Sequence, residues 1–144
     1  MISTLMAVSS PHMRELGIKF LRSGDRVAVS MLPYREDLVG DPRTGVLHGG
    51  VVTTLLDSTA GAAVISALTL PMPIATLDLR IDYLRPSTPG QPLYARAECY
   101  KLTRHVAFVR GTAYNDDAAD PVASVSATFM LRTQALPHPP QGSG

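Results

Sequence analysis

The fold of this chain is decided by residues 45–64, which read GVLHGGVVTTLLDSTAGAAV. Two adjacent glycines, Gly49 and Gly50, lower the stability of a helix or strand that contains them. Asp57 places a carboxylate in an otherwise apolar run, where burial costs free energy. From Val51 to Leu68 there is no proline, and apolar residues recur three and four positions apart around nearly the whole helical cylinder. This pattern predicts a buried helix rather than a surface helix.

After Pro73 the period of the apolar residues changes to two, which is typical of strands. The segment 75–86, ATLDLRIDYLRP, alternates one set of side chains with another: Leu77, Leu79, Ile81 and Tyr83 against Thr76, Asp78, Arg80 and Asp82. Three more such segments follow across short connections: LYARAECYKL, HVAFVRGTAY and VASVSATFML. Strands joined by connections this short are most simply antiparallel neighbours.

The remaining segments complete a single α+β domain over residues 1–133. Residues 9–16 predict a short helix with a serine cap, and residues 18–32 predict two strands that turn at Ser-Gly-Asp. Residues 33–47 predict a loop, and residues 134–144 form a Pro/Gly tail that we expect to be disordered. An antiparallel sheet therefore lies against one long apolar helix. Either the sheet curves around this helix or a second subunit covers it.

Composition excludes several classes of protein. The 144 residues are 45% hydrophobic and 17% charged with a net charge of +1, which suits one soluble domain and gives no basic field for nucleic acid. The longest apolar stretch, residues 59–70, falls short of a membrane span, and the N-terminus has no convincing signal peptide. A single cysteine, Cys99, excludes an internal disulfide, and the histidines show no metal-ligand spacing. We expect a cytoplasmic protein without a metal or cofactor.

The sequence His48-Gly49-Gly50 stands where the loop becomes the helix. The first N–H groups of a helix have no partner within it and carry partial positive charge, and glycine lets a ligand approach them closely. Such a site can bind an anion or a carbonyl oxygen that becomes an oxyanion. No phosphate-loop pattern follows the glycines. A glycine-rich helix start without a ligand fits the spacing equally well.

Asp57 lies eight residues after Gly49, in the middle of the predicted helix. A capping role does not fit that position, and small residues three and four positions away leave a groove around the carboxylate: Thr53, Thr54, Ala60 and Gly61. A carboxylate in a groove near an electropositive helix end can act as nucleophile or general base in acyl transfer. A solvated acid without a function is the alternative.

The segment LHGGVVTTLLD (47–57), followed by TLDLRIDYLRP (76–86), resembles the hotdog-fold acyl-CoA thioesterases of the phenylacetate-degradation (PaaI-like) group. The resemblance covers roughly residues 10–132. It implies a curved antiparallel sheet around a central helix, assembled as a homodimer or homotetramer. It also implies hydrolysis of an acyl-CoA thioester to free acid and CoA. In that reaction the Gly49 N–H polarises the carbonyl and Asp57 is the catalytic carboxylate.

The resemblance extends to Thr76, which falls where relatives often carry a Ser or Thr that places the water or the carboxylate. It fails at one position, because relatives usually have an Asn about six residues before the histidine. Here Pro42 stands at the matching place, and the neighbouring Asp41 is a carboxylate rather than an amide. This departure keeps open a protein that binds an acyl thioester without hydrolysing it. A hotdog dehydratase fits less well, because the chain lacks the His–acid pattern of those enzymes.

Gly50 and four further residues are candidates for binding the substrate. His48 is interpreted as a brace of the loop rather than as a general base. Arg85, and Arg104 with His105 in a predicted turn, are candidates for the nucleotide phosphates of CoA, since the guanidinium fork suits phosphate. Ordinary surface cations are the alternative for these three residues.

The spacing of the two proposed catalytic groups predicts a site shared between chains. Eight residues of helix separate Gly49 from Asp57 by about 12 Å, and the lean of the side chain recovers only a few ångströms. Two central helices packed antiparallel would bring Gly49 of one chain beside Asp57 of the other.

Overall fold

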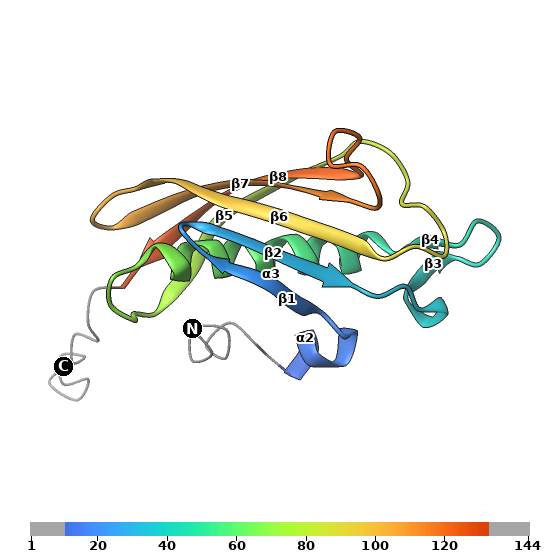
Figure 1. Cartoon of the computed structure of the whole chain (residues 1–144), viewed down its shortest axis with the longest axis horizontal. Helices are drawn as coiled ribbons and strands as arrows, with labels where there is room; N and C mark the ends of the chain where they lie inside the picture. The colour runs from blue at the N-terminus through green and yellow to red at the C-terminus, as the bar shows by residue number, and fades with distance from the viewer. Residues whose placement is uncertain (1–10, 133–144) are drawn as a thin grey trace, which may run out of the picture.

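The computed structural model describes residues 11–132, in which an antiparallel sheet curves around one long helix (Figure 1). The expected serine cap at residues 9–10 and the tail 134–144 lie outside the described residues. Within these residues the helices are α2 (Pro11–Leu16), the short 3-10 helix η1 (Glu36–Leu38) and α3 (Gly49–Ala67). The strands are β1 (Lys19–Gly24), β2 (Val27–Leu32), β3 (Val39–Asp41), β4 (Val46–Leu47), β5 (Ile74–Tyr83), β6 (Leu93–Leu102), β7 (Val106–Tyr114) and β8 (Ala123–Leu131).

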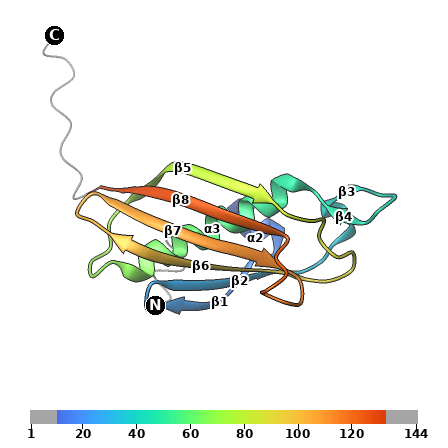
Figure 2. The ribbon, with the colours of Figure 1, turned by 90° about the horizontal axis from the view of Figure 1, so that it is seen from above.

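The main sheet has six antiparallel strands in the order β1-β2-β6-β7-β8-β5. Seen from above in Figure 2, the strands lie side by side over α3, with β1 and β5 at the two edges. The predicted curved antiparallel sheet around a central helix is therefore confirmed. The expected loop 33–47 is more regular than predicted, because it contains η1 and the short β3–β4 hairpin.

Small side chains on the inner face of the sheet let α3 approach closely. Alanines recur at buried, inward positions of three neighbouring strands: Ala95, Ala97, Ala107, Ala113, Ala123 and Ala127. A helix over such a face needs bulk of its own, and fully buried Leu55, Leu56 and Val64 supply it. Burial of these side chains is the main source of stability for the layered fold.

A buried polar pair sets the rotation of α3 about its axis. Ser30 of β2 donates to the Thr59 hydroxyl, which donates in turn to the Leu55 carbonyl at 2.7 Å. Thr59 therefore faces the sheet. Two residues of helix turn the chain by about 200°, so Asp57 lies on the opposite side, where the helix is only partly covered.

The all-round burial predicted for α3 is only half right. Its sheet-facing residues are buried, whereas Thr53, Thr54, Asp57 and Ser58 on the far side are partly exposed. By length and composition α3 is long and apolar enough to cross a membrane. The sequence-based expectation was different, because it considered only the apolar stretch 59–70, which is too short for a span. A buried core helix has the same composition, and the packing of α3 against the sheet accounts for it.

Strand β5 departs from the strict alternation that its sequence predicts. The register against β8 shifts between Thr76, opposite Phe129, and Asp78, opposite Thr128, so that Leu77 is an extra residue in a β-bulge. The sequence pattern grouped Leu77 with the inward residues and Thr76 with the outward ones. The structure reverses both: Leu77 is 52% exposed, and Thr76 turns toward α3.

Candidate active site

The start of α3 is fixed by His48. This residue is the N-cap in extended backbone (φ −62°, ψ 138°), and its Nδ1 accepts the Gly50 N–H at 3.0 Å. Its own N–H donates to the Leu38 carbonyl at 2.9 Å, which ties the helix start to η1. Because Nδ1 accepts, the proton of the neutral ring is on Nε2. His48 thus holds the backbone on both sides of the loop-to-helix transition.

One backbone donor at this helix start is left without an acceptor in the described part of the chain. The Gly50 N–H bonds to His48 Nδ1, and the Val51 and Val52 N–H groups bond to the His48 carbonyl at 3.0 and 3.4 Å. The Gly49 N–H has no such bond, and the residue is exposed. The free, electropositive donor is therefore the one that the sequence singled out.

Tyr83 at the end of β5 joins this helix start, a contact that its sequence pattern did not predict. Its hydroxyl donates to the Gly49 carbonyl at 2.9 Å and lies 2.7 Å from Thr53 Oγ1. The sequence feature that could have indicated this contact is the tyrosine of the segment YLRP (83–86). A tyrosine at an inward position of an edge strand is commonly a packing residue, so the pattern alone did not point to the helix start.

Asp57 is held from the other end of the same strand. The Thr76 hydroxyl donates to Asp57 Oδ1 at 3.3 Å. Burial raises the pKa of Asp57 above its ordinary value, and the Thr76 hydrogen bond partly opposes that rise. A partly desolvated carboxylate with a raised pKa is a better proton acceptor than a fully hydrated one.

A cavity of about 600 Å³ opens beside this carboxylate. Asp57, Ser58 and Thr76 give it a polar side. Most of the remaining wall is apolar. It comes from α2, α3, β8, the start of β5 and the segment that precedes β5, and it includes Met13, Ile65, Met72, Ile74 and Phe129. An apolar cavity with a few convergent polar groups is the usual form of a small-molecule site.

Gly49 and Asp57 do not meet within one chain. They lie eight residues apart on α3, or about 12 Å along its axis. Tyr83 and Thr76 contact them separately, near opposite ends of β5. The cavity includes Asp57 and Thr76 in its wall but not the His48-Gly49-Gly50 segment.

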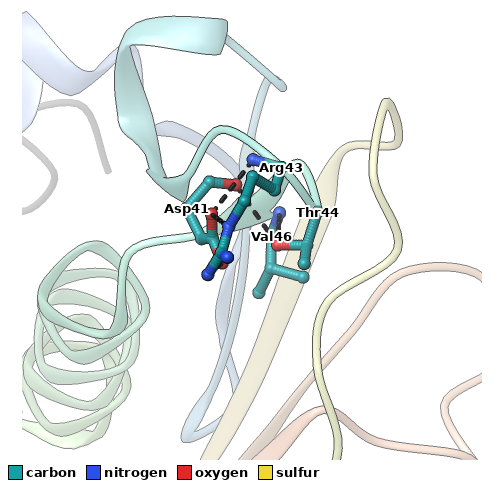
Figure 3. Close-up of polar contacts among 4 residues, drawn as sticks. All are labelled: Asp41, Arg43, Thr44 and Val46. Atoms are coloured by element: carbon teal, nitrogen blue, oxygen red, sulfur yellow. Dashed lines mark hydrogen bonds and ion pairs between the residues drawn. The ribbon is translucent and has the colours of Figure 1, made fainter.

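The region of the missing amide is occupied by a tight turn (Figure 3). Asp41 accepts the Arg43 N–H at 3.0 Å, and its two oxygens lie 3.2 and 3.3 Å from the Arg43 guanidinium. This pairing lowers the pKa of Asp41, which therefore stays ionised. Its carboxylate is used within the β3–β4 turn, and Pro42 beside it is exposed and has no side-chain donor.

The three candidates for phosphate binding lie at two ends of the sheet. Arg85 follows β5, where its guanidinium donates to the carbonyls of Pro86 and Asp120 and forms an ion pair with the Asp120 carboxylate at 3.2 Å. Arg104 and His105 are exposed in the β6–β7 turn, where the His105 carbonyl accepts from Leu131 at the far end of β8. One chain therefore does not bring Arg85 and Arg104 together. Residues 11–132 contain no cluster of three or more His, Cys, Asp or Glu residues that could hold a metal ion.

Comparison with known proteins identifies the family. The family description "Thioesterase superfamily" matches residues 44–122, which run from the β3–β4 turn through α3, β5, β6 and β7 to the residue before β8. The chain belongs to the thioesterase superfamily. Its antiparallel sheet around one central helix is the hotdog fold of that superfamily, and its activity is thioester hydrolysis.

Individual relatives agree with this assignment. The chain is 29% identical over 144 aligned positions to the medium/long-chain acyl-CoA thioesterase YigI of Salmonella typhimurium, covering 91% of this chain and 92% of YigI. A crystal structure from Pseudomonas aeruginosa is 40% identical with a TM-score of 0.80, over 91% of this chain and 95% of that one. A mutant of the phenylacetic acid degradation protein PaaI from Thermus thermophilus is 30% identical with a TM-score of 0.73, over 84% and 98%.

Proposed function

We propose that this member of the thioesterase superfamily hydrolyses acyl-CoA thioesters at a site formed by Asp57 and the Gly49 N–H. The observation that carries the proposal is Asp57 itself. It is a carboxylate with a pKa raised by burial, bonded to Thr76 at the polar side of an apolar cavity. Such a group has no packing role that an apolar residue would not fill better.

The reaction follows from these groups. The Gly49 N–H donates to the thioester oxygen, which becomes negative as the carbonyl carbon is attacked. Asp57 acts as nucleophile or general base. As a base it takes one proton from water while the oxygen of that water bonds to the carbonyl carbon. The C–S bond then breaks, and the proton leaves with the CoA thiol. Thr76 orients the carboxylate through its hydrogen bond.

The cavity favours an acyl group that is long and apolar. Its wall beyond Asp57 is formed by side chains such as Ile65, Met72 and Phe129, and its volume is about 600 Å³. The name of YigI, a medium/long-chain acyl-CoA thioesterase, points to the same class. We therefore assign a medium- or long-chain acyl-CoA as substrate, with the chain end beside Ile65 and the thioester beside Asp57.

The geometry of β5 supports a site shared between two copies of the chain. Strand β5 is a ten-residue edge strand, and its free edge offers unpaired backbone groups to a second strand. A two-fold axis near Arg80 would set Leu79 opposite Ile81 of the second copy. It would also set the bulged Thr76 segment opposite Tyr83. Because Thr76 holds Asp57 and Tyr83 contacts Gly49, this pairing brings the base of one copy beside the donor of the other.

The β-bulge at Leu77 makes this pairing possible, because it places Thr76 and Tyr83 on the same face of β5. Thr76 and Tyr83 are seven positions apart, an odd spacing that would put them on opposite faces of a regular strand. The extra residue Leu77 places both on the face toward α3. The same pairing would also cover the exposed side of α3. It would form a homodimer, either alone or as half of a homotetramer. It would also place Arg104 and His105 of one copy at the end where Arg85 of the other lies.

The test measures free CoA with a thiol reagent over acyl-CoAs of increasing chain length. Wild-type protein should release CoA, with the highest kcat/KM for medium or long chains. Asp57→Asn should lose about a hundredfold or more in turnover, since it keeps the shape and removes the base. Asp78→Asn, an exposed acid on the same segment as Thr76, is the matched control and should keep full activity. Near-normal hydrolysis by Asp57→Asn would place the chemistry elsewhere.

A further inference from the structure

We infer that Tyr83 is a positioning residue for hydrolysis: its hydroxyl fixes the first peptide of α3, next to the N–H that stabilises the oxyanion. The inference rests on the proposed role of Gly49. It assigns a function to a side chain for which the sequence pattern indicated no role.

The hydrogen bonds around Tyr83 form a directed chain. The Tyr83 hydroxyl has one proton, which it donates to the Gly49 carbonyl at 2.9 Å. Thr53 Oγ1, 2.7 Å away, is therefore the donor to the Tyr83 oxygen. The chain runs from Thr53 through Tyr83 to Gly49 and spans the first turn of α3. It anchors that turn to β5, where Tyr83 is paired with Ala123 of β8.

The helix start needs such an anchor. Gly49 and Gly50 are exposed and have the largest conformational freedom of any residue type, and helix ends fray. An oxyanion donor is effective only when it is aimed before the charge develops, because misplacement by about 1 Å can cost on the order of a hundredfold in rate. His48 holds one side of this segment through the Gly50 N–H. Tyr83 holds the other side through the Gly49 carbonyl.

The two anchors act on the same peptide group. The carbonyl of Gly49 and the N–H of Gly50 belong to one peptide, so a hydrogen bond to its oxygen strengthens the N–H as a donor to His48 Nδ1. Removing the Tyr83 hydroxyl therefore loosens both contacts of this peptide. The Gly49 N–H, one peptide earlier, then samples a wider range of directions.

The test compares Tyr83→Phe, which removes only the hydroxyl, with Tyr34→Phe. Tyr34 also donates to a loop carbonyl, that of Gly45 at 3.0 Å, and is the matched control. Tyr83→Phe should lower kcat about tenfold with KM unchanged, which corresponds to one lost positioning bond. Thr53→Val should lower kcat about threefold. The double variant should be no slower than Tyr83→Phe alone, because Thr53 acts through Tyr83. Tyr34→Phe should keep the wild-type kcat.

A second readout does not need turnover. Amide hydrogen exchange at Gly50 should become severalfold faster in Tyr83→Phe and remain unchanged in Tyr34→Phe. If Tyr83→Phe keeps kcat within twofold of wild type, or leaves Gly50 exchange unchanged, the inference is overturned. If Tyr83→Phe does not fold, Thr53→Val decides by the same two criteria. Failure of the proposed site is separate, since it would show as an active Asp57→Asn variant in the same assay.

Discussion

Two inactive variants of this chain should restore activity when they are mixed. Gly49→Pro removes the N–H that we propose as the oxyanion donor, and Asp57→Asn removes the proposed catalytic carboxylate. Proline is tolerated at the first position of a helix. The preceding residue, His48, already has the extended backbone that proline requires (φ −62°, ψ 138°). Each variant alone should lose about a hundredfold or more in turnover, the usual cost of removing an oxyanion donor or a base.

The expected recovery follows from the separation of the two groups. If about 12 Å of helix keeps Gly49 and Asp57 of one chain in different sites, each mixed dimer contains one site with both defects and one intact site. Free exchange of equal amounts gives mixed dimers as about half of the population, and each has one working site of two. About a quarter of wild-type activity should therefore return. A site within one chain predicts no recovery.

The assay is CoA release by the mixture, after a tag on one variant has shown that subunits exchange. Gly49→Ala is the matched control for Gly49→Pro, because it keeps the N–H. Its added Cβ would lie 3.6 Å from the Tyr83 hydroxyl oxygen, an ordinary contact, so it should remain active. A mixture that stays inactive although mixed dimers are present would refute the shared site.

Three further predictions concern Thr76, the titration of Asp57, and strand packing. Thr76→Ser should keep most activity, whereas Thr76→Val should lose part of it. Thr76→Val should also move the acid limb of the pH–rate profile to higher pH. The Thr76 hydrogen bond lowers the pKa of Asp57, so the pKa rises when that bond is removed. Burial raises that pKa above its unfolded value, so ionised Asp57 costs stability at neutral pH. Asp57→Asn should therefore raise the free energy of unfolding at pH 7 in denaturant titrations, and the gain should vanish below about pH 4. Gly111→Ala should lower that free energy by about 1–3 kcal/mol, since its Cβ would lie 2.5 Å from the Arg96 carbonyl oxygen. Gly24→Ala, with nothing within 4 Å, should change it much less.

The parts of the fold that local patterns encode were predictable from the sequence. The helical period after Gly50 and the period of two after Pro73 each report which faces are apolar, and burial follows from that directly. The start of α3 at Gly49 and the free N–H of that residue follow from the same reasoning, because helix ends always leave donors without partners.

The remaining features depend on contacts between distant segments. The β-bulge at Leu77 is invisible to a periodicity count, because a one-residue insertion looks like an ordinary apolar position. The contact of Tyr83 with Gly49 joins residues 34 positions apart, and only the packing of α3 along β5 creates it. The open side of α3 was missed because apolar residues were counted over the whole helix. Residues 59–64 are all buried, whereas the polar residues Thr53, Thr54, Asp57 and Ser58 of the first half are only partly covered.

The bulge in β5 has a consequence for how this chain is compared with its relatives. The alternation of side chains along β5 changes at the bulge. Before Leu77 the even-numbered residues face α3, and after it the odd-numbered residues do. A strand with unbroken alternation could keep Leu79 and Ile81 in the core or keep Thr76 in contact with Asp57, but not both. Leu77 is surplus to either requirement, so a chain without it would keep both faces in place. A relative that lacks this residue must be aligned with a gap here, since an ungapped alignment pairs Thr76 with a side chain on the opposite face.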